Sequence, residues 1–209
     1  MNVIDQYKWR YATKKFDAKK KISDSNIELI KESISLAPTS YGLQLFKVII
    51  VENQEIKNEL KKASYNQSQI SDASHIFVFC NSTKIIGDDI DNYIKNKSSI
   101  QNKPISEISG YGDFLKTTLL KKEHKKVSIW TANQVYIALS HLMTFCPSIG
   151  IDTCPVEGFD SYKYNEILNL NNRNLNSTVV AAVGYRSNKD SSQYEKKIRK
   201  SNDELFETI

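Results

Sequence analysis

Two cationic residues near the start of the chain, Arg10 and Lys14, lie four residues apart and could reach one anion. Lys197 and Arg199 lie two residues apart in a charged tail near the other end. Such side chains form charge-assisted hydrogen bonds with phosphate or carboxylate oxygens. The seven glycines form neither GxGxxG nor GxxxxGKS/T, so side chains would have to hold any bound phosphate. Ordinary solvated surface charge remains the alternative for each pair.

Three polar segments border apolar runs: Pro38–Gln44, the polar cluster Asn66–Gln69, and Pro155–Asp160. Side-chain and backbone donors in the Pro38–Gln44 loop could bind a polar ligand, but ordinary turns use the same residue types. Taken alone, Pro155–Asp160 is only a turn, in which Asp160 caps the next helix.

The cysteines and histidines do not have the spacing of a metal site. Cys80, Cys146 and Cys154 lie in apolar contexts without a CxxC pair, and the three histidines are scattered along the chain. This pattern is typical of reduced, buried thiols rather than of a disulfide or metal framework. We therefore expect no metal.

Composition and charge narrow the class of protein. The 209 residues are 40% hydrophobic, which fits one domain over 1–209 with a buried core. The net charge of +5 comes from lysines spread along the chain rather than gathered with aromatics, which does not favour nucleic-acid binding. No segment has the length and apolarity of a signal peptide or a membrane span, so the expected location is the cytoplasm.

The helix predicted over Val127–Phe145 organises the chain. The stretch between Lys126 and Asp152 has no formal charge, and apolar residues occupy almost every side of the helix. Such a helix is buried either in the core or at a subunit interface, and the small size of the chain favours the interface. Pro147 should end the helix, and Gly150 should let the chain turn.

Apolar runs separated by amphipathic segments predict an α/β or α+β sandwich. Buried strands are expected at 46–51, 76–80 and 178–183, and a short strand is expected at 151–154. Helices are expected at 4–9, from a Ser25–Glu28 capping box to Ala37, after an Asn53 cap, and over 162–168. The pattern is weakest over 84–126, where Pro104, Gly110 and Gly112 are predicted to break helical pieces.

Six motifs, in this order, resemble the FMN-dependent nitroreductases, specifically the group of oxygen-insensitive NAD(P)H nitroreductases and dihydropteridine reductases. They are Arg10-x-x-x-Lys14 with Phe16-Asp17, Pro38-Thr39-Ser40-Tyr41-Gly42-Leu43-Gln44, Asp72-Ala73-Ser74-His75, Trp130-x-x-x-Gln134-Val135-Tyr136, Pro155-Val156-Glu157-Gly158-Phe159-Asp160 and Lys197-x-Arg199. The resemblance covers nearly the whole chain. It implies an α+β three-layer sandwich, with a central, mostly antiparallel sheet flanked by helices, in an intertwined homodimer.

The resemblance also implies two FMN sites at the dimer interface, each built from both chains. Arg10, Lys197 and Arg199 would clamp the phosphate, and Lys14 would lie near N1 and O2 of the ring. The remaining cofactor contacts implied by position are Tyr11, Ala12, Pro38, Thr39, Ser40, Gln44, Asn66, Gln69, Pro155, Val156, Glu157 and Gly158.

Within that set, Asn66 would bond the pyrimidine edge, and backbone amides at Glu157 and Gly158 would face N5 and O4. Lys14 and Glu157 are the candidates for a catalytic role, Glu157 through flavin contact and water positioning. The chain departs from the family pattern where Tyr11-Ala12 replaces His-Ser, where Gln69 replaces a common Lys, and where Leu45 replaces a Pro.

The implied activity is ping-pong hydride transfer from NADH or NADPH through FMN to a small aromatic or quinone-like acceptor. The alternatives are a dihydropteridine reductase or another metabolite reductase on the same scaffold, a flavin-binding protein without turnover, and a basic nucleic-acid-binding module.

Overall fold

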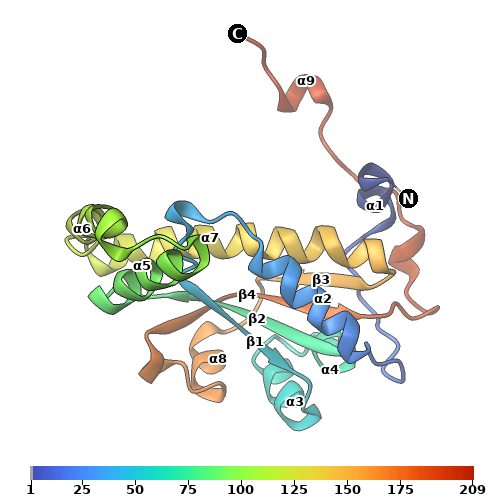
Figure 1. The fold of residues 1–209 in the computed structure, drawn as a ribbon. Helices are drawn as coiled ribbons and strands as arrows, with labels where there is room; N and C mark the ends of the chain where they lie inside the picture. The colour runs from blue at the N-terminus through green and yellow to red at the C-terminus, as the bar shows by residue number, and fades with distance from the viewer. Residues whose placement is uncertain (1) are drawn as a thin grey trace.

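A four-stranded antiparallel sheet forms the middle layer of the computed structural model, which describes residues 2–209 (Figure 1). The strand order is β1-β2-β4-β3, so β1 and β3 are the edges. The strands are β1 Phe46–Val51, β2 His75–Ser82, β3 Asp152–Val156 and β4 Leu175–Gly184. The α+β prediction is confirmed, and each of the four expected strands is present.

Helices cover both faces of the sheet because its side chains alternate between two cores. Phe77 and Phe79 pack toward α2 and α7, whereas Ile76, Val78 and Cys80 pack toward the opposite layer. One layer holds α2 Asp24–Ser35 and α7 His124–Phe145. The other holds α3 Gln54–Lys62, α4 Ser68–Asp72 and α8 Ser161–Ile167. The three-layer sandwich is therefore confirmed.

Most of the remaining helices lie at the two ends of α7, and the last one lies out on the C-terminal tail (Figure 1). A helix pair with its own small core lies at one end, and α1 lies at the other, where the tail leaves the body. The helices are α1 Val3–Trp9, α5 Gly87–Gln101, α6 Ile105–Leu119 and α9 Asn202–Leu205, with short 3₁₀ turns η1 Ser40–Gly42, η2 Cys146–Ile149, η3 Asn171–Arg173 and η4 Ser191–Tyr194.

Two local predictions are wrong. The cap of α2 is Ser23, whose hydroxyl accepts from the Asn26 amide, and Ser25 lies within the first helical turn. Gly110 and Gly112 do not break a helix but lie inside α6. Gly112 is buried, and a Cβ there would lie 3.0 Å from Cγ1 of Ile94, so this glycine allows α6 to approach α5 closely.

The long helix ends as expected but is not covered on every side by its own chain. The chain leaves α7 after Phe145 into η2, and Gly150 turns it with φ of +69°. Val135, Ala138 and Leu142 are buried, whereas Ile129 is 57% exposed and Tyr136 is 41% exposed. We call the uncovered side, formed by Ile129, Ala132, Asn133, Tyr136 and Ser140, the open face of α7.

Candidate functional site

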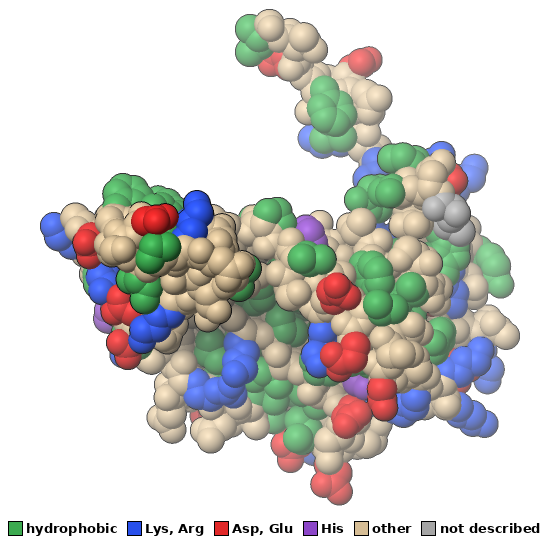
Figure 2. Space-filling view, in the orientation of Figure 1, with side chains coloured by type: hydrophobic (Ala, Val, Ile, Leu, Met, Phe, Trp, Pro, Cys, Tyr) green, Lys and Arg blue, Asp and Glu red, His purple; other side chains and the backbone are tan. Residues whose placement is uncertain are grey.

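The two cationic pairs predicted from the sequence line one cavity, of about 270 Å³. We call it the cation cavity; its wall is Arg10, Tyr11, Ala12, Lys14, Ser192, Glu195, Lys196, Lys197 and Arg199. The tail is held against α1 here, because Lys197 Nζ donates to the Lys8 carbonyl at 2.6 Å. Basic side chains gather where the tail leaves the body, and Figure 2 shows this position beside α1.

The charges in the cation cavity are not balanced. Burial lowers the pKa of Arg10, and Arg199 lowers it further. Lys197 is largely exposed, but partial desolvation of its ammonium lowers its pKa, together with repulsion from Arg10 and Arg199. Among the residues of the wall, Glu195 carries the one negative charge. An anion bound here would relieve the repulsion between these cations.

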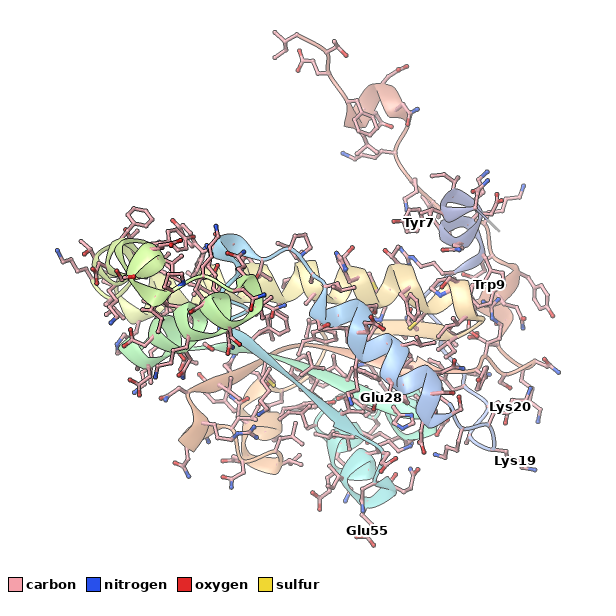
Figure 3. The ribbon with its side chains drawn as sticks, in the orientation of Figure 1. Tyr7, Trp9, Lys19, Lys20, Glu28 and Glu55 are labelled. Atoms are coloured by element: carbon pink, nitrogen blue, oxygen red, sulfur yellow. The ribbon has the colours of Figure 1, made fainter. Side chains whose placement is uncertain are left out.

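Two anchors that sequence analysis missed hold the N-terminal side of the cavity. Arg186 lies between the rings of Trp9 and Tyr11, with Cζ 4.1 and 4.7 Å from their centroids, and forms an ion pair with Asp152 at 2.6 Å. Asp190 accepts the Tyr11 hydroxyl at 2.9 Å. The position of Trp9 next to the base of the tail is visible in Figure 3.

The same N-terminal segment runs beside β3, which connects the cation cavity to the Pro155–Gly158 segment. Ala12 forms a parallel bridge with Thr153, and the Thr13 amide donates to the Thr153 carbonyl. Burial raises the pKa of the Cys154 thiol, and nearby Lys14 opposes that rise. Pro155 and Val156 belong to β3 rather than to the predicted loop, which begins at Glu157.

Glu157 and Gly158 are exposed at the end of β3, and side chains from two layers hold them. The Tyr136 hydroxyl donates to the Glu157 carboxylate, and burial and this bond raise the pKa of Tyr136 to about 12. Gln67 Nε2 donates to the Gly158 carbonyl at 2.7 Å, and Gln69 Nε2 donates to Gln67 Oε1 at 2.8 Å. Gln69, expected to contact the ligand, is instead buried and bonded to Gln67, a residue of the same segment for which the sequence predicted no role.

Asn66 is exposed near this segment, in the turn that leads into α4. It has a φ of +60° and follows Tyr65, which has a φ of +52°. Two consecutive residues with side chains rarely adopt this left-handed conformation, which here projects both from the surface. The turn is fixed by the Asn66 amide, which donates to the Lys61 carbonyl.

The predicted loop Pro38–Gln44 lies apart from the cation cavity. The Ser40 amide donates to Gln134 Oε1 at 2.8 Å, in the middle of α7, and Gln44 Nε2 donates to the Ser35 carbonyl. Tyr7 of α1 instead contacts Thr144, near the end of α7. Gln134 and Thr144 are separated by about 15 Å along the helix axis. Within one chain, therefore, Pro38, Thr39, Ser40 and Gln44 do not join the residues of the cation cavity.

Two properties of the described residues, 2–209, bear on the class of site. No group of three or more His, Cys, Asp or Glu side chains is arranged to hold a metal ion. Within the same range, every helix is too short or too polar to cross a lipid bilayer.

Comparison with known proteins gives the family. Residues 7–185 match the nitroreductase family. YfkO of Bacillus subtilis, which carries the name of an NAD(P)H nitroreductase, is 34% identical over 195 residues, 88% of each chain. SSP0379 of Staphylococcus saprophyticus, named in the same way, is 32% identical over 217 residues, 99% of this chain and 96% of its own. The fold matches a nitroreductase of Exiguobacterium sibiricum solved in complex with FMN, with a TM-score of 0.86, 16% identity and coverage of 100% of this chain and 98% of that chain. The chain belongs to the nitroreductase family.

Proposed function

We propose that this chain is an NAD(P)H-dependent FMN oxidoreductase of the nitroreductase or quinone reductase type. The cation cavity carries the proposal, because it brings Arg10, Lys14, Lys197 and Arg199 together in a member of the nitroreductase family. Relatives named as NAD(P)H nitroreductases and a neighbour solved with FMN support the choice of donor and cofactor.

The residues of the cation cavity fit the phosphate of FMN. The pKa values of Arg10 and Lys197 are lowered by desolvation and by neighbouring cations, and a phosphate dianion between them would remove that repulsion. Arg199 adds a planar guanidinium that can bond two phosphate oxygens. Because the chain lacks a glycine-rich phosphate loop, these side chains would supply the binding.

When bound, FMN would supply a ring that accepts hydride from a nicotinamide and passes it to an acceptor. Lys14 would offset negative charge on that ring. The backbone amides of Glu157 and Gly158 would orient it, and Gln67 holds this segment from the other side. Because the Glu157 carboxylate accepts from Tyr136, we assign it to positioning rather than to proton donation.

We propose that the active form is a homodimer in which each FMN site takes residues from both chains. The open face of α7 supports this, because a single chain leaves Ile129 and Tyr136 in water. The separation of Pro38–Gln44 from the cation cavity supports it too. A second copy would bring its own loop to the cavity of the first.

The proposed acceptor is a small nitroaromatic compound or a quinone, reduced in a ping-pong cycle with the nicotinamide. Aromatic side chains beside the Pro38–Gln44 loop support a flat acceptor, because Tyr41 packs against Trp130 and Phe114, with ring centroids 6.1 and 6.5 Å apart. We also propose a cytoplasmic location, which agrees with three buried free thiols.

The test combines cofactor binding with turnover. We expect the purified protein to bind FMN and to oxidise NADH or NADPH when a quinone is added. Arg199→Ala should weaken FMN binding roughly ten- to a hundredfold, since it removes a charge-assisted contact of about 1.5–3 kcal/mol. Arg173→Ala, an equal charge change on η3, should bind FMN as the parent does. A protein that binds no flavin would refute the proposal.

A further inference from the structure

We propose that Asp190 is a positioning residue that locks the two halves of the cation cavity together and thereby sets its selectivity for flavins that carry a phosphate. The inference rests on the proposed function. It begins from a carboxylate that is only 2% exposed although it lies next to the surface cavity. The sequence gives no hint of it, since Asp190 lies in a charged, glycine-free stretch of the tail.

One oxygen of Asp190 holds the N-terminal half. Oδ2 accepts the Tyr11 hydroxyl at 2.9 Å, the Lys14 amide at 2.8 Å and the Lys15 amide at 3.1 Å. These bonds fix the path of the backbone from Tyr11 to Lys15. The directions of the Lys14 side chain and of the Tyr11 ring, which packs on Arg186, follow from that path.

The other oxygen holds the tail half. Oδ1 accepts the Ser192 amide at 3.2 Å and begins η4, and the Asp190 carbonyl accepts Gln193 Nε2 at 2.7 Å. The chain then leaves η4 toward Lys197, which returns to α1 through its bond to the Lys8 carbonyl. Asp190 is thus the side chain that joins the segment carrying Arg10 and Lys14 to the segment carrying Lys197 and Arg199.

Only an ionised carboxylate can make this set of bonds, because it offers two acceptor oxygens and no donor. Burial by itself would raise the pKa of Asp190, but hydrogen bonds from Lys15, Lys14, Tyr11 and Ser192 outweigh burial and lower it. An asparagine has a single acceptor oxygen, so it must abandon either the N-terminal half or the tail half.

Charge and geometry predict opposite results for Asp190→Asn, which makes the proposal testable. The substitution removes a negative charge beside an anion site, so charge alone predicts tighter binding of the FMN phosphate. If Asp190 acts by positioning, binding of FMN weakens instead, because the cations no longer converge. Riboflavin, which lacks the phosphate, reports on the rest of the site.

The experiment titrates the full-length protein with FMN and with riboflavin and compares the two dissociation constants. For Asp190→Asn, which loses several hydrogen bonds, we expect the ratio of the riboflavin dissociation constant to the FMN dissociation constant to fall about tenfold or more. For Tyr11→Phe, which loses one hydrogen bond, we expect the same ratio to fall about threefold. The double variant should bind as Asp190→Asn does, because Tyr11 acts through the carboxylate. Glu55→Gln, an equal charge change at the far end of the molecule, is the control (Figure 3).

The outcomes separate this inference from the proposed function. An unchanged or raised ratio in Asp190→Asn overturns the positioning role while FMN binding by the parent protein stands. A general loss of stability would weaken both flavins alike and leave the ratio unchanged, which also counts against the proposal. If Asp190→Asn does not fold, Tyr11→Phe decides by the same ratio. A parent protein that binds neither flavin overturns both inferences.

Discussion

Lys14 is the residue whose charge should have the largest effect on the chemistry of a bound flavin. A lysine ammonium, if held about 5 Å from N1, would favour the reduced ring by roughly 3 kcal/mol at an effective dielectric of about 20. For a two-electron couple this corresponds to about 70 mV as an upper limit. The neutral Gln69, buried against Gln67, supplies no such charge.

We therefore predict that Lys14→Ala lowers the midpoint potential of bound FMN by tens of millivolts and that Gln69→Lys raises it. Potentiometric titration of the parent and both variants measures this. If Gln69→Lys leaves the potential unchanged, Gln69 does not lie beside the ring.

Lys57 is a second residue with a measurable electrostatic consequence, far from the cation cavity. Its side chain is 0% exposed, and Nζ donates to the Ala73 carbonyl at 2.8 Å. Burial lowers the pKa of Lys57 to about 8, Lys21 lowers it further, and Asp72 opposes the shift. Because the folded pKa lies below the unfolded value, the unfolded state binds more protons between pH 8 and pH 10.

The free energy of unfolding should therefore rise between pH 8 and pH 10, and Lys57→Met should flatten that slope. Urea unfolding of both proteins at the two pH values is the measurement. Equal slopes in the two proteins would mean that the ammonium of Lys57 is stabilised as well in the folded protein as in water.

The sequence identifies the cations of the site but not the residues that hold them in place. Arg and Lys at suitable spacing are recognisable by type, because only they can bind a phosphate without a glycine-rich loop. Asp190 and Gln67 act through partners 179 and 91 residues away in the chain. Such pairings depend on the tertiary fold, and no local pattern encodes them.

At the scale of elements, prediction succeeds where the signal is local. Asn53 and Asp160 cap α3 and α8 as expected, because a cap bonds an amide three residues away. Prediction fails at α2, where Ser23 and Ser25 are equally suitable by type. Ser23 is the cap because it is the last residue with extended backbone before the helix begins at Asp24. Prediction also fails in α6, where the role of Gly112 depends on α5 rather than on its own neighbours.

The two glycines of α6 provide a matched test. Gly110 is exposed, with nothing within 4 Å of an added Cβ, so Gly110→Ala should raise the free energy of unfolding by about 0.5–1 kcal/mol through helix propensity. Gly112→Ala should raise the free energy of unfolding by less, or lower it, because the added Cβ would lie 3.0 Å from Ile94. Denaturant unfolding gives both values, and equal stabilisation would show that α5 and α6 separate easily.

For the whole molecule, the layered fold could be predicted because strands and helices differ in the spacing of their apolar residues. The oligomeric state could not be predicted in the same way. Apart from the family resemblance, the indication of a partner came from apolar residues all around α7, and a core helix gives the same pattern. The open face of α7 favours a partner over a core helix, because its apolar side chains are exposed in the single chain. The homodimer is a prediction.

We predict that the parent protein has about twice the chain mass of 23.9 kDa by light scattering. Ile129→Glu should produce monomers and lose FMN binding at the same time, since a buried unpaired charge opposes the interface. Tyr162→Glu, at a still more exposed position on α8 below the opposite face of the sheet, is the control. Dimers that persist in Ile129→Glu would place the interface elsewhere.

One side of the cation cavity is formed by the C-terminal tail, which projects away from the layered body (Figures 1 and 2). Every residue from 195 to 209 is exposed in the single chain. Lys196, Lys197, Arg199 and Lys200 lie in the extended part of the tail, where trypsin cleaves most readily. One cut there would detach phosphate-binding cations while leaving all four strands intact. Sensitivity of this segment to limited digestion, and its protection by flavin, would therefore report cofactor occupancy without any measurement of turnover.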